Sequence, residues 1–199
     1  ENYIAQHSQN EPDVLASLSR ETYLKVVQPR MITGHHQGRV LSILSKIARP
    51  KTILEIGTFT GYSAICLAEG LRPDGLLHTI DLNVELETMQ RRFFDQSGMG
   101  DAIVQHVGDA LDIIPKMDFN FDLVFIDGQK SAYNAYFEAV IGKMNPGGII
   151  LCDNVLWSGK VVAPLDRNDK ATKALLSFNQ RMKTDPRLET VILPVRDGL

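Results

Sequence analysis

The spacing of apolar and polar positions changes character near Thr52. Before it, two segments, Pro12 to Val27 and Gln37 to Ala48, show the three-to-four-residue repeat of amphipathic helices. The positions predicted to face inward are Val14, Leu15, Leu18, Tyr23, Leu24 and Val27 in the first, and Val40, Leu41, Ile43, Leu44 and Ile47 in the second. Arg49-Pro50 ends the second helix, because the residue before a proline disfavours helical geometry.

From Thr52 onward, short apolar runs alternate with helical patterns. The predicted strands are Thr52 to Ile56, Leu76 to Ile80, Ala102 to Val107, Phe121 to Ile126, Gly148 to Cys152 and, near the end, Glu189 to Leu193. The predicted helices are Tyr62 to Leu71, Val84 to Gln96, Ala110 to Ile114, Ser131 to Met144 and Thr172 to Lys183. Strands joined by crossover helices predict an α/β fold with a mostly parallel, Rossmann-like sheet covered on both faces.

Length and composition predict one domain. The 199 residues, 44% hydrophobic and 23% charged, suit a single globular unit, with an N-terminal helical cap over 1–50 and the α/β core over 51–199. The chain lacks an initiator Met and stops at the turn sequence Asp197-Gly198-Leu199. We therefore expect a longer natural protein and a truncated last strand.

Charge and hydropathy narrow the class of partner. The net charge of -3 leaves no basic footprint for nucleic acid, and no stretch has the roughly 18 apolar residues of a membrane helix. The N-terminus has no signal-peptide pattern. Cys66 and Cys152 lie inside apolar runs, which favours buried free thiols in a reducing, cytoplasmic setting over a disulfide.

The stretch from Thr52 to Ser63 predicts a cofactor site. A strand, two glycines (Gly57 and Gly61) and a helix start follow one another, so a ligand can approach bare backbone and the first amides of the helix. Phe59 occupies the place of the second glycine of the dinucleotide fingerprint and would obstruct a diphosphate. The pattern therefore favours a nucleoside cofactor without phosphates, of which S-adenosylmethionine is the commonest.

Ligands of open parallel sheets bind at the carboxyl ends of the strands, where four more residues stand out. Asp81 ends the second strand and suits a ribose diol, although it is also placed to cap the helix from Val84. Asp127 ends the fourth strand, and Asp153-Asn154 end the fifth. If those two strands are neighbours, two carboxylates and an amide converge, a donor set that suits Mg²⁺. The alternative is that each acidic residue only caps a turn.

Lys130 follows Asp127 by three residues, at the start of the next helix. Desolvation and a nearby metal both favour a neutral amine, which could then accept a hydroxyl proton. The alternative is a solvated surface lysine.

Taken together, these segments resemble a known family. The motifs E-I-G-T-F-T-G-Y-S, T-I-D-L-N, V-G-D-A-L-D-I-I-P, F-D-L-V-F-I-D-G-Q-K and I-L-C-D-N-V-L-W-S-G-K-V are similar to those of the cation-dependent O-methyltransferases. That family includes catechol O-methyltransferase and the caffeoyl-CoA O-methyltransferases. The resemblance runs from about Met31 to Leu199. It implies a methyltransferase fold that uses S-adenosylmethionine, and a homodimer.

The resemblance also implies roles at matching positions. Asp127, Asp153 and Asn154 match the metal ligands, and Lys130 matches the proposed general base. The positions that match cofactor-binding residues are Met31, Thr33, Glu55, Gly57, Ser63, Asp81, Asp109, Ala110 and Asp127. The irregular segment from Val155 to Asp169 matches part of the acceptor pocket.

Some positions depart from catechol O-methyltransferase or carry two interpretations. Gly128 and Gln129 replace bulky residues after the first metal-binding Asp, so the pocket walls differ. Trp157 resembles the caffeoyl-CoA and bacterial members and is either a wall of the acceptor site or a packing residue. His35-His36 are interpreted as surface or capping residues, because adjacent helical residues point in different directions.

The sequence thus predicts methyl transfer from S-adenosylmethionine to one hydroxyl of a vicinal diphenol, with Mg²⁺ chelating both oxygens. Two alternatives remain open. One is a tRNA hydroxyuridine methyltransferase, for which Arg91, Arg92 and Lys160 would have to form a basic patch. The other is a non-catalytic protein that only binds the cofactor.

Overall fold

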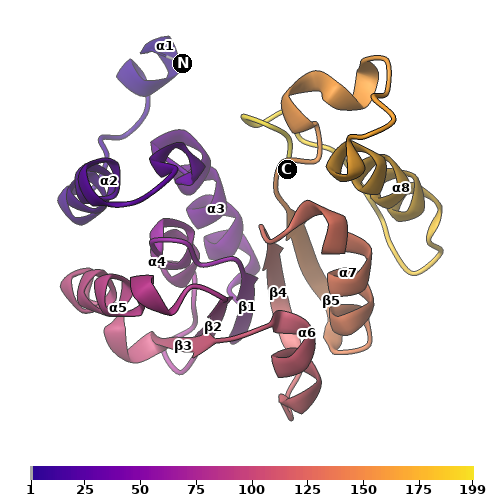
Figure 1. Ribbon diagram of the computed structural model, residues 1–199. Helices are drawn as coiled ribbons and strands as arrows, with labels where there is room; N and C mark the ends of the chain where they lie inside the picture. The colour runs from indigo at the N-terminus through magenta and orange to yellow at the C-terminus, as the bar shows by residue number, and fades with distance from the viewer. Residues whose placement is uncertain (1) are drawn as a thin grey trace.

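A parallel sheet of five strands forms the centre of the protein. The computed structural model, which describes residues 2–199, contains β1 (Thr52–Ile56), β2 (Leu76–Asp81), β3 (Ile103–Val107), β4 (Phe121–Ile126) and β5 (Met144–Cys152). The strands lie in the order β3-β2-β1-β4-β5, and each neighbouring pair is parallel (Figure 1). The predicted α/β architecture is therefore confirmed.

Helices cover both faces of the sheet. The α-helices are α1 (Asn2–Gln6), α2 (Asp13–Lys25), α3 (His35–Ala48), α4 (Tyr62–Ala68), α5 (Glu87–Gln96), α6 (Ala110–Ile113), α7 (Tyr133–Ile141) and α8 (Lys170–Thr184). The 3₁₀ turns are η1 (Pro29–Met31), η2 (Val84–Leu86), η3 (Gly100–Ala102), η4 (Ile114–Lys116), η5 (Lys130–Ala132) and η6 (Trp157–Val162). In Figure 1, α2 to α5 gather on one side of the sheet, and α6, α7 and α8 lie on the other.

The strands bury side chains on both faces, as a doubly covered sheet requires. In β4, Leu123 and Phe125 belong to the core under α2 to α5, whereas Val124 and Ile126 belong to the core under α6 to α8. No helix within residues 2–199 is long and apolar enough to cross a membrane.

The buried faces of the first two predicted helices differ from the expectation. In α2 the buried residues are Leu15, Leu18 and Thr22, while Tyr23, Leu24 and Val27 are exposed. In α3, Leu41 is buried and Val40 and Leu44 are partly buried, as predicted, but Ile43 and Ile47 are exposed. The helix also buries Gln37, Gly38, Ser42 and Ser45. The reason is close packing on α4: Ser45 Oγ donates a hydrogen bond to the Leu67 carbonyl at 2.6 Å. The short α1 was not predicted.

Several predicted boundaries were also wrong. The helix from Tyr62 ends at Ala68 rather than Leu71, where Gly70 packs against Ser45 with no room for a Cβ. The fifth strand begins at Met144 rather than Gly148, because Phe121 pairs with Met144 before the register shifts toward Leu123. The preceding helix consequently ends at Ile141.

The predicted strand from Glu189 to Leu193 is absent from the described residues. Only its last residue pairs: Leu193 N donates to Leu199 O at 2.8 Å, and Leu199 N donates to Leu193 O at 3.0 Å. These bonds close a turn through Val195 to Gly198. A ladder needs a longer run of partners, so the segment stays irregular.

Candidate active site

The strand order reverses between β1 and β4, and the candidate site lies at the carboxyl ends of these two strands. The chain passes outward through β1, β2 and β3, then crosses to β4 and β5. Asp127 N donates to Ile56 O at 2.8 Å, and Gly57 N donates to Ile80 O at 2.9 Å, which holds the strand ends together. Gly57 has φ of 101°, and a Cβ there would collide with the Asp127 carbonyl. Such a switch point is where open α/β sheets bind ligands.

A small, partly open cavity lies beside this glycine turn. It is lined by Met31, Ile32, Thr33, Gly57, Thr58, Phe59, Thr60, Tyr62, Ser63 and Asp127. The structure therefore brings Met31 and Thr33, from the loop before α3, next to the turn after β1. Five of the predicted cofactor residues line this one cavity: Met31, Thr33, Gly57, Ser63 and Asp127.

Glu55, the fourth residue of β1, is completely buried. Its Oε2 accepts a hydrogen bond from Thr79 Oγ1 at 2.6 Å, but its Oε1 has no partner among the residues that the structure describes. Burial raises the pKa of Glu55 to about 8, while hydrogen bonds from Ser63 and Thr79 oppose the rise. A buried carboxylate with one free oxygen fits a ligand that brings an ammonium group.

The remaining predicted cofactor residues hold turns. Asp81 accepts from Phe59 N at 2.7 Å and from Asn83 N at 2.8 Å, which ties the glycine turn to the end of β2. Asn83, not Asp81, caps the following helical turn. Asp109 caps α6 by accepting from Leu111 N, and Ala110 begins that helix after β3. Asp81, Asp109 and Ala110 all lie outside the cavity lining.

The three predicted metal ligands follow two neighbouring strands. Ile126 pairs with Cys152 in the register, and Asp153 N donates to Ile126 O at 2.9 Å, so Asp127 and Asp153 emerge side by side. Burial raises the pKa of both carboxyl groups, and their mutual repulsion adds to the rise at Asp153. Asn154 sits in the left-handed region, with φ of 60°.

Within residues 2–199 no three His, Cys, Asp or Glu side chains form a group that could hold a metal ion. A site at this edge therefore needs the amide of Asn154 beside the two carboxylates. Such an all-oxygen donor set suits Mg²⁺ and similar hard cations rather than zinc or copper.

Lys130 lies directly over Asp127. Its Nζ donates to Asp127 Oδ1 at 2.8 Å and to Tyr133 Oη at 2.7 Å. Only 10% of the Lys130 side chain is exposed. The alternative of a solvated surface lysine is therefore wrong, and the amine contacts the acidic cluster.

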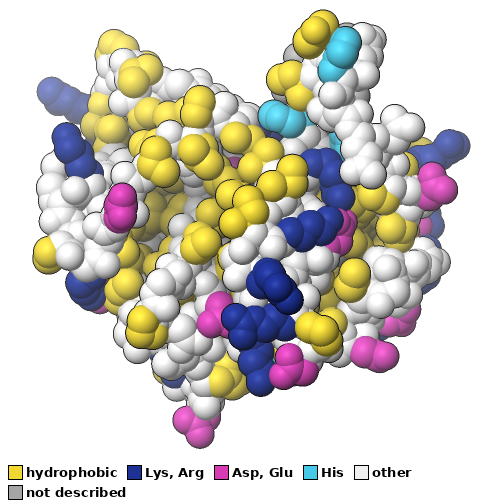
Figure 2. Space-filling view, turned by 180° about the vertical axis from the view of Figure 1, so that it is seen from behind, with side chains coloured by type: hydrophobic (Ala, Val, Ile, Leu, Met, Phe, Trp, Pro, Cys, Tyr) yellow, Lys and Arg dark blue, Asp and Glu magenta, His cyan; other side chains and the backbone are white. Residues whose placement is uncertain are grey.

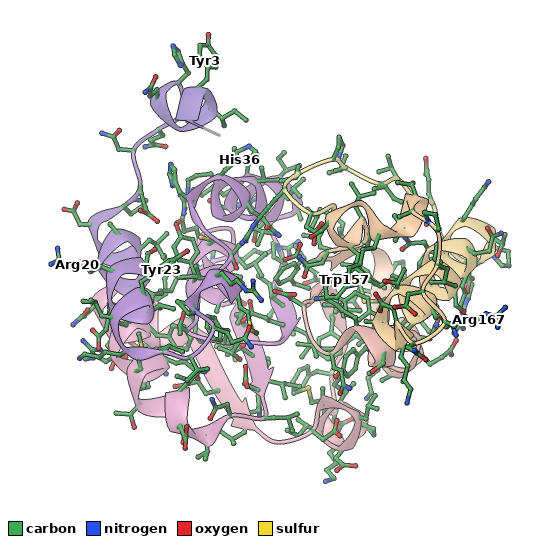
Figure 3. All side chains as sticks on the ribbon, turned by 45° about the horizontal axis from the view of Figure 1, so that its top comes forward. Tyr3, Arg20, Tyr23, His36, Trp157 and Arg167 are labelled. Atoms are coloured by element: carbon green, nitrogen blue, oxygen red, sulfur yellow. The ribbon has the colours of Figure 1, made fainter. Side chains whose placement is uncertain are left out.

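The structure also gives the positions of Trp157 and His35. Trp157 has φ of 48°, and its buried indole Nε1 has no hydrogen-bond partner within the described part of the chain. In Figure 3 it lies near the middle of the molecule, between the N-terminal helices and α8. His35 begins α3 and bonds through Nε2 to Gln9 O at 2.7 Å.

Sequence reasoning missed three residues at this edge. Tyr133 contacts Lys130. Gln37 is buried, and neither atom of its amide has a hydrogen-bond partner among residues 2–199. Arg196 Nη1 donates to Ile32 O at 2.9 Å and to Thr33 O at 2.6 Å. Only Tyr133 had a sequence signal, since it follows Lys130 at helical i,i+3 spacing.

Comparison with known proteins identifies the family of this chain. The sequence model of the O-methyltransferase family matches residues 5–199, a longer span than the motifs alone indicated. The chain belongs to this O-methyltransferase family. Caffeoyl-CoA O-methyltransferase 1 of Eucalyptus globulus is 34% identical over 199 aligned residues, covering 95% of this chain and 80% of the relative.

Solved structures of methyltransferases resemble the structure of this chain. The SAH-bound methyltransferase PaMTH1 of Podospora anserina has a TM-score of 0.89 at 28% identity, covering 99% of this chain and 90% of that one. TomG of Streptomyces achromogenes, an O-methyltransferase of tomaymycin synthesis solved with SAM, has a TM-score of 0.84 at 31% identity, covering 92% and 82%. The Rossmann-like methyltransferase fold is thus established for this O-methyltransferase.

Proposed function

We propose that this O-methyltransferase transfers a methyl group from S-adenosylmethionine to one hydroxyl of a vicinal diphenol, with the help of Mg²⁺. The observation that carries the proposal is the contact of Lys130 with Asp127, beside Asp153 and next to the cavity of the glycine turn. A candidate base and an acidic oxygen cluster thus adjoin the pocket of the glycine turn, an arrangement that suits methylation of a chelating oxygen pair.

The residues of the cavity fit the cofactor. The free oxygen of buried Glu55 would accept the ammonium group of its methionyl part. Met31 and Thr33 would cover it, while Asp81, Asp109 and Ala110 would face its ribose and adenine. S-adenosylmethionine, when bound, supplies the methyl group as an activated sulfonium.

The strand ends fit the acceptor. Asp127, Asp153 and Asn154 would hold the cation, which when bound lowers the pKa of an acceptor hydroxyl and fixes both oxygens. Lys130 would receive the proton that leaves this hydroxyl, and Trp157 would form one wall of the aromatic site.

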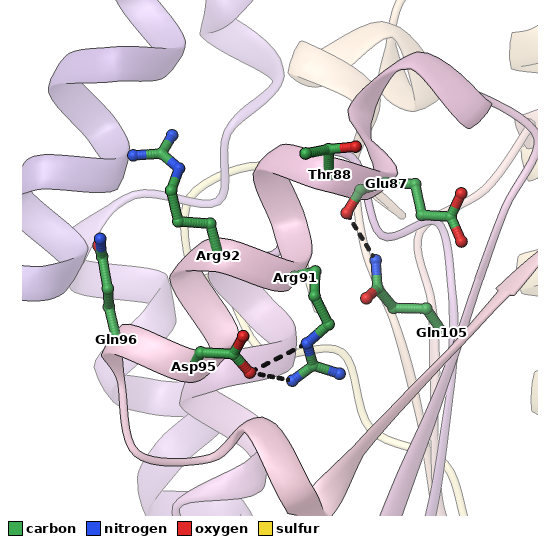
Figure 4. A pocket seen from close by; sticks show the side chains of 7 residues that line it. All are labelled: Glu87, Thr88, Arg91, Arg92, Asp95, Gln96 and Gln105. Atoms are coloured by element: carbon green, nitrogen blue, oxygen red, sulfur yellow. Dashed lines mark hydrogen bonds and ion pairs between the residues drawn. The ribbon is translucent and has the colours of Figure 1, made fainter.

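The tRNA alternative has less support. Arg91 forms an ion pair with Asp95 and donates to the Gly100 carbonyl, Arg92 pairs with Glu21, and Lys160 pairs with Asp169. The wider surface hollow on α5 (Figure 4) is lined by these same two arginines together with acidic and amide side chains. On the face drawn in Figure 2, several Lys and Arg side chains lie together in a band near the middle, with carboxylates along its edges. Paired cations bind phosphates poorly, so a small aromatic substrate is favoured.

We also propose, from the family resemblance, that the protein forms a homodimer, which a sedimentation measurement of its mass in solution would test. Cys66 and Cys152 are both free, which suits the cytoplasm that we propose as its location.

The substrate class is tested by a product screen. The purified protein is given S-adenosylmethionine, Mg²⁺ and, separately, a free catechol, a caffeoyl thioester, a flavonoid diol, the matched monophenols and bulk tRNA, and methylated products are identified by mass spectrometry. We expect singly methylated diphenols and no methylated monophenol, because chelation needs two adjacent oxygens. Methylation of tRNA alone would contradict the proposal. Cofactor binding in calorimetry without any product would show a non-catalytic binder.

A further inference from the structure

The hydroxyl of Tyr133 connects the candidate base to the strand that carries Asp153. Tyr133 begins α7 and is completely buried, with its ring edge-on to Phe178 at a centroid distance of 5.4 Å. Its Oη accepts a hydrogen bond from Lys130 Nζ at 2.7 Å and lies 2.8 Å from Asp153 O and 3.2 Å from Ile126 O. Since a phenol has one proton, it donates mainly to the nearer carbonyl, that of Asp153.

We propose that Tyr133 is a positioning residue, which fixes the direction in which Lys130 exchanges a proton with the acceptor. This inference rests on the proposed function, in which Lys130 receives the acceptor's proton.

The geometry of an amine gives the reason. The Lys130 nitrogen has four tetrahedral positions, of which one is bonded to Cε. Two more point to Asp127 Oδ1 and Tyr133 Oη. Only one position is then left for proton exchange with a bound acceptor. Without the Tyr133 hydroxyl, the flexible lysine chain keeps one anchor, and the amine can rotate about it.

Ring packing alone does not explain this tyrosine. A phenylalanine would fill the same space against Phe178, whereas a buried hydroxyl is costly unless it is hydrogen-bonded. Here the hydroxyl is within hydrogen-bonding distance of three polar atoms, one on Lys130 and two at the ends of β4 and β5. The Tyr133 hydroxyl therefore holds the Lys130 amine in a fixed position relative to the strand ends that carry Asp127 and Asp153.

The test is Tyr133→Phe, with Tyr136→Phe as the matched control, since Tyr136 is a second buried tyrosine of α7. Steady-state kinetics are measured with catechol and with a nitro-substituted catechol that is already ionised at the assay pH. For catechol, we expect Tyr133→Phe to lower kcat about ten- to a hundredfold, less than the roughly 10²- to 10⁴-fold of a whole general base, because Lys130 is misdirected but still present. KM for both substrates and the affinity for SAH should change little. With the ionised acceptor most of the loss should disappear, because no proton has to be removed. Tyr136→Phe should resemble the wild type.

Other results of this experiment would overturn the inference. An equal loss with both acceptors would show a structural role and overturn the inference, as would wild-type kinetics of Tyr133→Phe. If the wild type methylates no diphenol, the proposed function fails, and this inference fails with it.

A double-mutant cycle tests whether Tyr133 acts through Lys130. In a Lys130→Ala background, Tyr133→Phe should cost no further kcat if it acts through Lys130. An additional, independent loss in that background would contradict the proposal.

Discussion

Some buried side chains among residues 2–199 have polar atoms without a hydrogen-bond partner. Within the part of the chain that the structure describes, one buried oxygen of Glu55 has no hydrogen-bond partner. Neither the oxygen nor the nitrogen of the Gln37 amide has one there either. Unsatisfied buried polar atoms are rare in folded proteins because each one costs free energy. The free oxygen of Glu55 is the one that we propose for the ammonium group of the cofactor.

The raised pKa of Glu55 makes cofactor binding depend on pH. Below about pH 8 the carboxyl group is largely protonated in the free protein, so binding a cationic amine must first remove that proton. We expect the affinity for SAH to rise between pH 6 and pH 8, by at most about tenfold per unit. Calorimetry across this range should show the rise for the wild type and a weaker, flat response for Glu55→Gln. A pH-independent wild type would contradict this role of Glu55.

The same shift has a consequence for folding. The folded pKa of about 8 lies above the ordinary value of 4.5, so the folded state binds more protons between these limits. The contribution of Glu55 to stability is therefore present below about pH 4.5 and is lost as the pH rises toward 8.

The sequence predicted the candidate site residues that directly follow strands. It did not predict the residues that are recognised only because they are buried. Asp127 and Asp153 could be predicted because strand ends converge at one sheet edge. The role of Gln37 could not, because its helix was expected to bury a different face.

The elements around the site show why that face was misjudged. The apolar repeat of α3 placed Ile43 and Ile47 inward, yet they are 57% and 74% exposed. Small residues decide the packing instead: a Cβ at Gly38 would lie 2.6 Å from Tyr62 Cε1 and 2.9 Å from Cys66 Sγ. Hydrophobic periodicity does not record how closely two helices approach.

This packing predicts unequal effects of two substitutions in α3. Gly38→Val should lower the free energy of unfolding by about 1–3 kcal/mol, because the buried Tyr62 ring has no space to move. Ile47→Ala should change it by no more than about 0.5 kcal/mol, as expected for an exposed side chain. Urea unfolding measures both. A larger loss for Ile47→Ala than for Gly38→Val would show that α3 packs through its apolar repeat.

Across the whole molecule, the strand order gathers the site from distant parts of the sequence. Alternating strands and helices predicted a parallel sheet, but not the order β3-β2-β1-β4-β5 that sets Gly57 beside Asp127. Nor could the sequence indicate that Arg196, near the end of the chain, binds the carbonyls of Ile32 and Thr33. Such contacts depend on long-range closure, for which local patterns carry no signal.

We propose that methyl transfer to a diphenol requires a divalent cation at Asp127, Asp153 and Asn154. The most direct measurement is the rate of diphenol methylation after treatment with EDTA and after adding Mg²⁺ back, for the wild type and for Asp127→Ala. We predict that EDTA abolishes wild-type activity and that Mg²⁺ restores it. Asp127→Ala should lose more than about a hundredfold even in excess Mg²⁺, while SAH still binds. Full activity of either protein in EDTA would contradict the account.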